Sequence, residues 1–227
     1  MIPIKDENPG RTFPLVTLSI IVANISVFLY QLTLPHGLQN DFVMTFGLVP
    51  AALTGGADLA GSSFPPILTL FTSQFLHGGI FHLLGNMLYL WIFGNNIEDV
   101  LGRFRFLLFY LLCGVLAAIA HLILNTESII PMVGASGAIA GVLGAYLMTF
   151  PGARVVVLVF LFIFITTIRV QTFWVLGLWF LMQLLYAGSS ATGAVTNVAY
   201  MAHVGGFLAG IWLMRKFRPR VKWKVIK

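Results

Sequence analysis

Long apolar segments alternate with short polar connections along the whole chain. A helix needs about 17–25 predominantly apolar residues to cross a bilayer. Seven segments lie near or within that range, at 14–34, 79–95, 105–124, 134–150, 155–168, 172–187 and 198–214. The pattern predicts an all-α membrane protein with six or seven spans.

The fifth apolar segment, 155–168, differs from the others. It has only 14 residues, which is short for a helix that crosses a bilayer. It is also rich in Val, Ile, Phe and Thr, which favour β-structure. We therefore assign 154–170 to a re-entrant or interfacial element on the cytoplasmic side.

The positions of the positive charges decide between six spans and seven. The thirteen Lys and Arg residues precede the first segment, separate the second from the third, flank the fifth and follow the last. The connections 35–78, 125–133 and 188–197 contain none. Because loops rich in Lys and Arg stay in the cytoplasm, we predict a six-transmembrane-helix bundle with cytoplasmic N- and C-termini.

The expected domain organisation follows from this topology. A cytoplasmic N-terminal segment, 1–13, precedes the six-span membrane domain, 14–214, and a basic cytoplasmic tail, 215–227, follows it. The external loop 35–78 has semi-apolar patches, so we expect it to fold against the membrane surface. No internal repeat stands out, which weighs against transporters built from inverted repeats.

Composition and charge agree with a membrane location. Hydrophobic residues make up 59% of the chain and charged residues 9%, a balance that excludes a water-soluble domain. The net charge is +6, and seven of the thirteen basic residues lie in 215–227. Because this tail follows a span directly, it predicts contact with anionic lipid headgroups and no nucleic-acid partner. We expect a multi-pass protein of a prokaryotic cytoplasmic membrane.

Polar side chains inside spans are costly, so each needs a partner or a function. The candidates are His82 and Asn86 in the second span, Ser136 in the fourth, Gln183 in the fifth and His203 in the sixth. All except Gln183 fall in the first turns of spans that run from outside to inside. We therefore expect those four side chains at one depth, near the outer leaflet.

These four side chains can supply the groups that hydrolyse a peptide bond. Ser136 offers a hydroxyl at a helix N-terminus, where unpaired N–H groups and the helix dipole favour negative charge. Histidine titrates near neutral pH, which suits His203 as a general base. Asn86 and His82 are side-chain donors for an oxyanion. The acidic residues lie at span ends or in connections, so the predicted chemistry is a Ser–His dyad.

Simpler interpretations of these residues stay open. The small residues around Ser136 and around His203 fit a close helix-packing surface, and such packing would also bring the two side chains together. His82 and Asn86 fit hydrogen bonding at a helix end, and Gln183 fits an interhelical hydrogen bond. A metal site that uses the two histidines lacks a third ligand, so we expect no cofactor.

A pair of acidic residues lies at the predicted cytoplasmic turn between the second and third spans. Glu98 and Asp99 are followed by Arg103 and Arg105. This proximity predicts an ion-pair cluster that holds the turn.

Three motifs resemble those of the rhomboid family of intramembrane proteases, over about 70–214. The HxxxN pattern of His82 and Asn86 resembles the second span of the family. The GASG sequence at 134–137 resembles its nucleophile motif, with Ser136 as the serine. AHVGGFLAG at 202–210 resembles its AHxxGxxxG motif, with His203 as the base.

The resemblance implies an intramembrane serine endopeptidase. It implies that the oxyanion is bound by the Ser136 backbone N–H and by the side chains of His82 and Asn86. It also implies that the substrates are transmembrane helices of other proteins, admitted near the fifth span and cut near the outer membrane face.

Two positions depart from the family pattern. Ala140 stands where many members have an aromatic residue that stacks on the histidine, so the resemblance does not show what fixes the His203 ring. Leu68-Thr69 stands where some members have a Trp-Arg pair, which leaves the shape of the external loop open.

Two other functions compete with the protease. A rhomboid-like protein that binds membrane helices without cutting them is one, although the presence of both Ser136 and His203 argues against it. A small-solute transporter or channel is the other, but the predicted spans contain no charged residue at mid-membrane.

Overall fold

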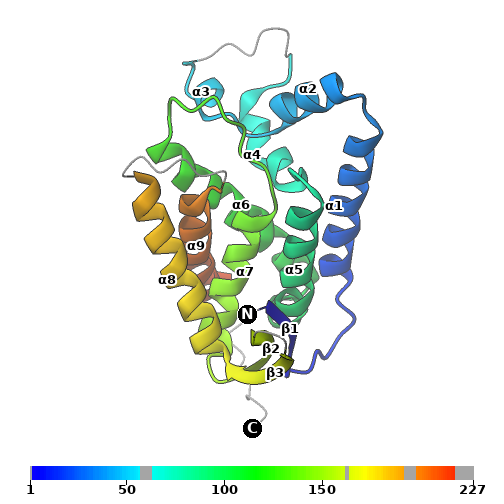
Figure 1. Ribbon diagram of the computed structural model, residues 1–227, viewed down its shortest axis with the longest axis vertical. Coiled ribbons are helices and arrows are strands. Elements are labelled where there is room, and N and C mark those ends of the chain that lie inside the picture. The colour runs from blue at the N-terminus through cyan, green and yellow to red at the C-terminus, as the bar shows by residue number, and fades with distance from the viewer. Residues whose placement is uncertain (1, 57–62, 162–163, 192–197, 218–227) are drawn as a thin grey trace.

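Six helices of 14 to 22 residues pass up and down through the bundle in the part of the chain that the structure describes. This is a computed structural model that describes residues 2–56, 63–161, 164–191 and 198–217. The helices are α1 (Leu15–Thr33), α5 (Ile80–Leu101), α6 (Arg103–Leu124), α7 (Ser136–Thr149), α8 (Thr172–Ala191) and α9 (Tyr200–Phe217). Figure 1 shows α7 at the centre of the bundle. Each helix falls on a predicted apolar segment, so the helical positions are confirmed.

The all-α description holds for the bundle but is wrong for the whole chain. The structure has a three-stranded antiparallel sheet with the order β1-β2-β3. Its strands are β1 (Ile2–Asp6), β2 (Arg154–Leu161) and β3 (Phe164–Gln171). The predicted element at 154–170 is a β-hairpin because β-branched residues dominate it. The N-terminal segment 1–13 supplies the third strand, which no pattern in its sequence indicated.

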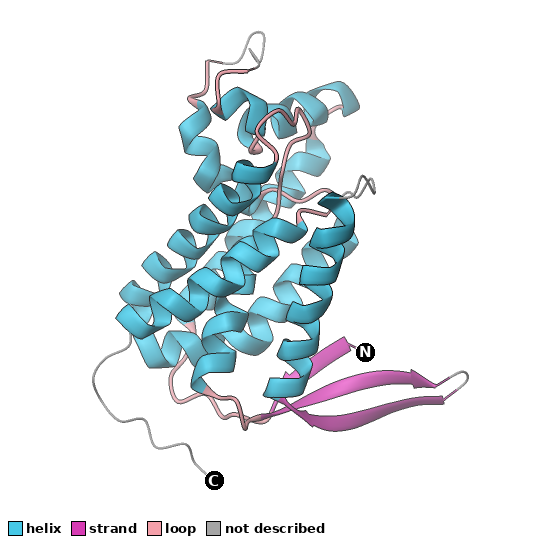
Figure 2. Cartoon of the chain, turned by 90° about the vertical axis from the view of Figure 1, so that its left-hand side faces the viewer, coloured by secondary structure: helices cyan, strands magenta, loops and turns pink. Residues whose placement is uncertain are grey.

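The sheet lies at one end of the bundle, and its hairpin projects sideways from it (Figure 2). Val155 and Val157 of β2 are buried at 0% and 1% exposure and join the core. Asp6 of β1 accepts hydrogen bonds from the Tyr146 hydroxyl at 2.7 Å and from Asn96 Nδ2 at 2.8 Å. The strand β1 therefore ties the sheet to both α5 and α7.

The helix α7 lies within the core of the bundle. Every residue of α7 from Gly137 to Tyr146 is buried. Added Cβ atoms at Gly206 and Gly210 of α9 would fall on the backbone carbonyls of Gly137 and Gly141. The two backbones are therefore in direct contact, which is the close packing that small residues permit between membrane helices.

The acidic pair at the turn binds backbone N–H groups at the start of α1 and in the segment just before it, and not the nearby arginines. Glu98 is 2% exposed and accepts hydrogen bonds from the backbone N–H groups of Val16 and Thr17 at 2.9 and 2.7 Å. Asp99 accepts from the backbone N–H groups of Arg11 and Thr12 at 2.6 and 3.1 Å. The predicted ion-pair cluster is therefore wrong. Glu98 binds the free N–H donors at the N-terminus of α1, where the helix dipole also attracts a carboxylate, and Asp99 binds the segment before that helix.

The connection 35–78 packs over the opposite end of the bundle (Figure 1). Its described residues form α2 (His36–Phe46), α3 (Pro50–Leu53), a 3₁₀ turn (Pro66–Leu68), α4 (Thr69–Thr72) and a second 3₁₀ turn (Ser73–Phe75). Leu48 and Met132 exchange backbone hydrogen bonds of 3.0 and 2.8 Å. These bonds hold the connection against the segment that leads to α7.

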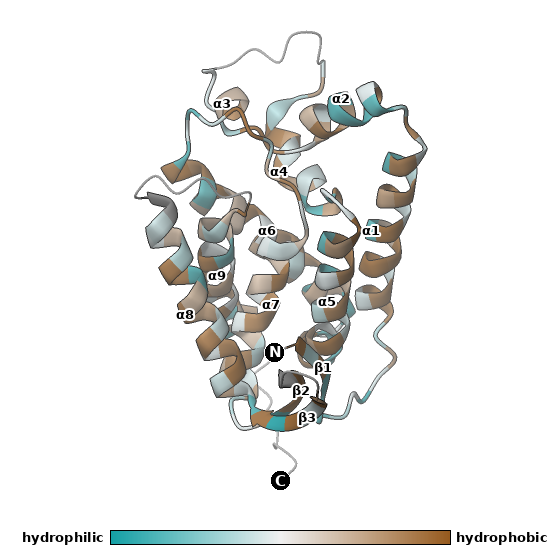
Figure 3. Ribbon diagram, viewed as in Figure 1, coloured by the Kyte–Doolittle hydropathy of each residue, from teal (hydrophilic) through white to brown (hydrophobic). Residues whose placement is uncertain are grey.

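Apolar residues follow the lengths of the helices (Figure 3). Among the described residues, three helical segments are long and apolar enough to cross a membrane, at Leu15–Thr33, Arg103–Leu124 and Thr172–Ser189. A bent pair, Pro66–Phe75 with Ile80–Leu101, brings the number to four. The helix α7, with 14 residues, is shorter than a usual span. Most of the basic tail 215–227 lies outside the described residues.

Candidate active site

Ser136 is the first residue of α7, and the chain reaches it through a glycine turn. Gly134 has φ +124°, a conformation that residues with a side chain rarely adopt. Its N–H donates to the Ser73 carbonyl at 2.9 Å. An added Cβ at Gly134 would lie 2.7 Å from the His82 ring. Glycine is therefore required for the backbone to pass close to the second predicted span.

Ser136, His203 and Gln183 form one line of hydrogen bonds across three helices. His203 Nε2 lies 2.9 Å from Ser136 Oγ, and His203 Nδ1 lies 2.8 Å from Gln183 Oε1. The Gln183 side-chain oxygen can only accept, so Nδ1 carries the proton and Nε2 accepts from the serine hydroxyl. Gln183 makes the predicted interhelical hydrogen bond, and its partner is the residue predicted to be the base.

The ring of His203 is bounded by two aromatic side chains that sequence reasoning missed. The Trp179 ring lies 5.9 Å away at 33°, and the Tyr200 ring lies 6.3 Å away at 88°. Ala140, the position at which the resemblance led us to expect a stacking aromatic residue, is fully buried. Trp179 precedes Gln183 by four residues and so shares its helix face. The four-residue spacing between Trp179 and Gln183 was the sequence signal that could have placed Trp179 beside the site.

The helix contact explains why the serine and the histidine meet. Ser136 is one residue before Gly137, and His203 is three residues before Gly206. Because the Gly137 carbonyl lies where a Cβ of Gly206 would be, the first turns of α7 and α9 are held together. The packing interpretation and the catalytic interpretation of these motifs therefore use the same glycines.

His82 and Asn86 lie on the first turns of α5, beside the backbone that precedes Ser136. Asn86 is 8% exposed, and its Nδ2 lies 2.9 Å from His77 Nε2. The backbone of His77 is held by the Gln31 side chain of α1, which accepts from its N–H at 3.2 Å and donates to its carbonyl at 3.4 Å. This arrangement orients the Asn86 amide, and the sequence alone did not indicate it.

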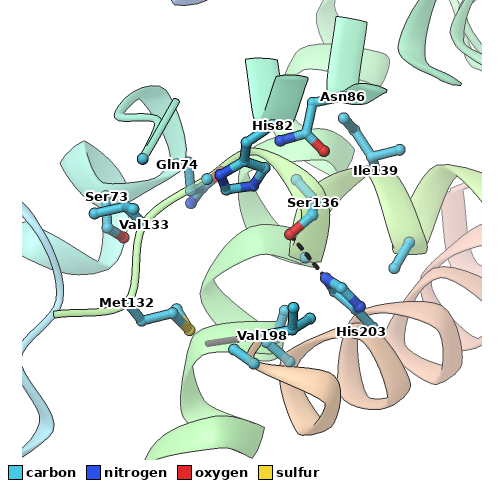
Figure 4. Close-up of a pocket in the computed structure, with 18 of the residues that line it drawn as sticks. Ser73, Gln74, His82, Asn86, Met132, Val133, Ser136, Ile139, Val198 and His203 are labelled. Atoms are coloured by element: carbon cyan, nitrogen blue, oxygen red, sulfur yellow. Dashed lines mark hydrogen bonds between the residues drawn. The ribbon is translucent and has the colours of Figure 1, made fainter. Parts of the chain in front are cut away.

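One pocket of about 1010 Å³ contains all four predicted site residues. Figure 4 shows Ser136, His203, His82 and Asn86 around this pocket, with the hydrogen bond between Ser136 and His203 dashed. The walls also include residues of the connection before α7, such as Met132 and Val133. The pocket therefore offers a hydroxyl, an imidazole and two side-chain donors to one bound group.

The arrangement fits proton transfer from a hydroxyl better than metal binding. Within the described ranges, no three His, Cys, Asp or Glu side chains come together as metal ligands would. His203 already uses both ring nitrogens in hydrogen bonds to Ser136 and Gln183. A hydroxyl that is hydrogen-bonded to an oriented imidazole is the arrangement that activates a serine nucleophile.

Comparison with known proteins gives a family match over most of the chain. A model of the Rhomboid domain matches residues 66–220. RHOMBOID-like protein 1 of Arabidopsis thaliana is 29% identical over 221 residues, which covers 88% of this chain and 52% of that protein. Rhomboid protease GluP of Bacillus subtilis (strain 168) is 37% identical over 143 residues, with coverage of 63% and 24%.

A human relative gives a similar picture. Presenilin-associated rhomboid-like protein, mitochondrial, is 29% identical over 211 residues, which covers 90% of this chain and 48% of that protein. The chain spans about half the length of the plant and human relatives, and less of the bacterial one. The integral-membrane part of the predicted location is supported. The prokaryotic part is not favoured by relatives that include plant and mitochondrial proteins.

Proposed function

The chain belongs to the rhomboid family, and on that basis we propose that it is an intramembrane serine endopeptidase. Ser136 is the nucleophile and His203 is its general base. The observation that carries the proposal is the 2.9 Å contact between Ser136 Oγ and His203 Nε2, in a pocket that also contains two side-chain donors. The substrates are transmembrane helices of other proteins.

The first step forms an acyl-enzyme. As Ser136 Oγ attacks the scissile carbonyl carbon, its proton moves to His203 Nε2. His203 then carries a positive charge, which the Gln183 oxygen on Nδ1 stabilises. The protonated imidazole gives this proton to the leaving amine when the C–N bond breaks. Water, activated by the same imidazole, then hydrolyses the ester.

The oxyanion of each tetrahedral intermediate needs donors that are already in place. The backbone N–H of Ser136 lies at a helix N-terminus, where no intrahelical acceptor competes for it. Asn86 Nδ2 has two hydrogens, and one can face His77 while the other faces the pocket. The His82 side chain is the third donor. Preorganised donors of this kind lower the barrier without reorganisation during the reaction.

The topology that we propose has six spans and cytoplasmic termini. Its support is the alternation of Lys and Arg between connections and the up-and-down passage of the six helices (Figure 1). The basic tail then faces anionic lipid headgroups. A cysteine at Glu127 should react with an impermeant thiol reagent from outside, and one at Lys224 only after permeabilisation. External labelling at both positions would contradict this topology.

The activity is tested with purified protein in lipid vesicles. A panel of membrane-anchored helices should be cut near the outer face, and Ser136→Ala should abolish cleavage at the mapped bond. Chelator-treated protein should keep its rate, whereas loss restored by zinc would move His82 and His203 to metal binding. If folded Ser136→Ala still cuts at the same bond, the protease proposal is wrong.

A further inference from the structure

The β2–β3 hairpin has apolar side chains exposed on both of its faces. Neighbouring residues of a strand point to opposite faces, and Phe164 and Ile165 are 70% and 66% exposed. Ile168, on the same face as Phe164, is 42% exposed. Surfaces that are apolar on two sides are rarely left in water. The outer half of the hairpin therefore needs an apolar environment that the rest of the described chain does not supply.

The charges of the hairpin lie at its opposite end, next to the bundle. Arg154 pairs with Gln171 in the first register position of the hairpin, and both arginines of this segment lie within three residues of that end. Arg169 Nε contacts Glu7 Oε1 at 2.7 Å, and its side chain is still 69% exposed. The hairpin thus has a cationic base and an apolar outer half, which is the distribution of an element bound at a bilayer surface.

The backbone sets how deep such an element can lie. In the described chain β3 pairs only with β2, so the outer edge of β3 has free N–H and C=O groups. Open sheet edges do not occur in the hydrocarbon region. At the boundary of headgroups and acyl chains these groups can bind water or headgroups while Phe164 and Ile165 contact lipid. The boundary is therefore the depth that fits both the edge and the side chains.

The exposed apolar residues of the hairpin are followed directly in the chain by exposed apolar residues of α8. The helix α8 begins at Thr172, one residue after β3. Its first outward side chains, Phe173 and Trp174, are 53% and 57% exposed. Tryptophan is enriched where a membrane protein meets the headgroups. Figure 2 shows the hairpin leaving the bundle at this end of the helices.

The base of the hairpin also holds the start of α8. The Thr172 N–H donates to the Ala153 carbonyl at 2.8 Å, and its hydroxyl donates to the same oxygen at 3.0 Å. The Phe173 N–H donates to the Pro151 carbonyl at 3.2 Å. These bonds join the base of the hairpin to the first turn of α8, and α8 carries Gln183, the hydrogen-bond partner of His203.

From these contacts we propose that the β2–β3 hairpin is a lipid-docking element. Its outer half lies at the boundary of headgroups and acyl chains, and its base holds α8 at the height at which Gln183 meets His203. The docking itself does not depend on the enzyme activity. The effect on His203 rests on the proposed function.

Spin-label accessibility tests the docking without any cleavage assay. Single cysteines at Phe164 and Ile165 are labelled with a nitroxide in the full chain, in vesicles of phosphatidylcholine with phosphatidylglycerol; Cys113 stays in place because it is fully buried. Leu178, exposed on α8, is the lipid control, and Glu127, exposed in a polar connection, is the water control. Labels at 164 and 165 should collide with oxygen, and their accessibility to a water-soluble nickel complex should lie between that at 178 and that at 127.

Two results would overturn the docking. Nickel accessibility at 164 and 165 equal to that at 127 would place the hairpin in water. Protection from both reagents, together with short label-to-label distances between copies, would mean that a second chain covers the hairpin by pairing with the β3 edge.

The link to α8 is tested with a charge on the outer half. Ile165→Glu should shift the membrane depth of a label at Leu185 on α8 and lower the cleavage rate in vesicles about threefold. The effect on the rate is small because a charge close to the membrane interface has only a small free-energy cost. Thr167→Glu places the same charge on the same face, two residues nearer the base. It should change neither the depth of the Leu185 label nor the cleavage rate. An unchanged Leu185 depth in Ile165→Glu would contradict the link. Absence of cleavage by the parent protein would count against the proposed function and leave the depth result intact.

Discussion

The two helix contacts that meet at His203 are built in opposite ways. The α7–α9 contact is backbone against backbone, with glycines where a Cβ would strike a carbonyl. The helix α8 instead has large apolar side chains exposed along its length, such as Leu178 at 51% and Leu185 at 59%. The position of the imidazole thus depends on a buried contact, whereas its orientation depends on a helix that faces lipid.

This difference separates stability from activity. Changes in the α7–α9 contact should destabilise the protein, because a packed backbone contact cannot adjust. Changes in α8 should leave the fold intact and alter the reaction, because α8 contributes Gln183 and Trp179 to the surroundings of His203.

The largest effect is expected from the same substitution placed in the two regions. Gly210→Ala would put a methyl group on the Gly141 carbonyl, so it should lower the free energy of unfolding by about 1–3 kcal/mol or more. Gly177→Ala in α8 meets nothing within 4 Å, and it should be neutral or stabilise by about 0.5–1 kcal/mol. Thermal unfolding in detergent measures both. Equal melting temperatures for the two variants would contradict the expected difference in stability between the α7–α9 contact and α8.

Loss of an oxyanion donor comes next. Asn86→Ala should lower kcat by about 10²–10³, the usual cost of one such donor. His82→Ala should behave similarly if its ring is the further donor. Both are measured as cleavage rates on folded protein. A rate for Asn86→Ala equal to that of the parent would mean that this amide only holds His77.

A smaller effect is expected from the positioning of the imidazole. Gln183→Leu keeps the volume and removes the acceptor for His203 Nδ1, and it should lower kcat about tenfold, less than the about 10²–10⁴ that a general base contributes. KM should change little because Gln183 is 8% exposed and not among the residues that line the pocket. An effect on KM alone would assign Gln183 to substrate binding.

The smallest expected effect is on the pH dependence of stability, and it comes from Asp6 in the sheet at the end of the bundle away from the site. Burial raises the pKa of Asp6 above its ordinary value of 3.8, against hydrogen bonds from Tyr146 and Asn96 that lower it. The folded state therefore binds this proton more tightly than the unfolded state, and stability falls as pH rises from 3.8 through the raised pKa. Asp6→Asn should remove that decline. The melting temperatures of the parent and the variant are measured from about pH 3 to about pH 7. Parallel curves for the two proteins would contradict the expected effect of Asp6.

The helices were predictable because their apolar lengths and charges are local signals. Ser136, His203, His82 and Asn86 could be selected because polar residues are rare within spans. The contacts of Gln183 and His77 could not be predicted from the sequence, since hydrogen bonds between helices depend on how the helices pack. The role of Glu98 was missed for the same reason: the arginines are near it in sequence, but the start of α1 is near it in space.

The hairpin shows the limit of composition as evidence. The β-prone residues of 155–168 indicated that this segment is not a span, which the structure confirms. The partner strand β1 could not be foreseen, because a five-residue strand such as Ile2–Asp6 has too few residues for a clear alternation.

The central claim, that His203 activates Ser136, is tested most directly by covalent labelling. The protein in vesicles is treated with a fluorophosphonate, and the modified residue is identified by mass spectrometry of its peptides. We predict one adduct on Ser136, strongly reduced in folded His203→Ala and absent in Ser136→Ala. An equal rate of modification of Ser136 in the parent and in His203→Ala, or no adduct in a folded parent, would contradict the account.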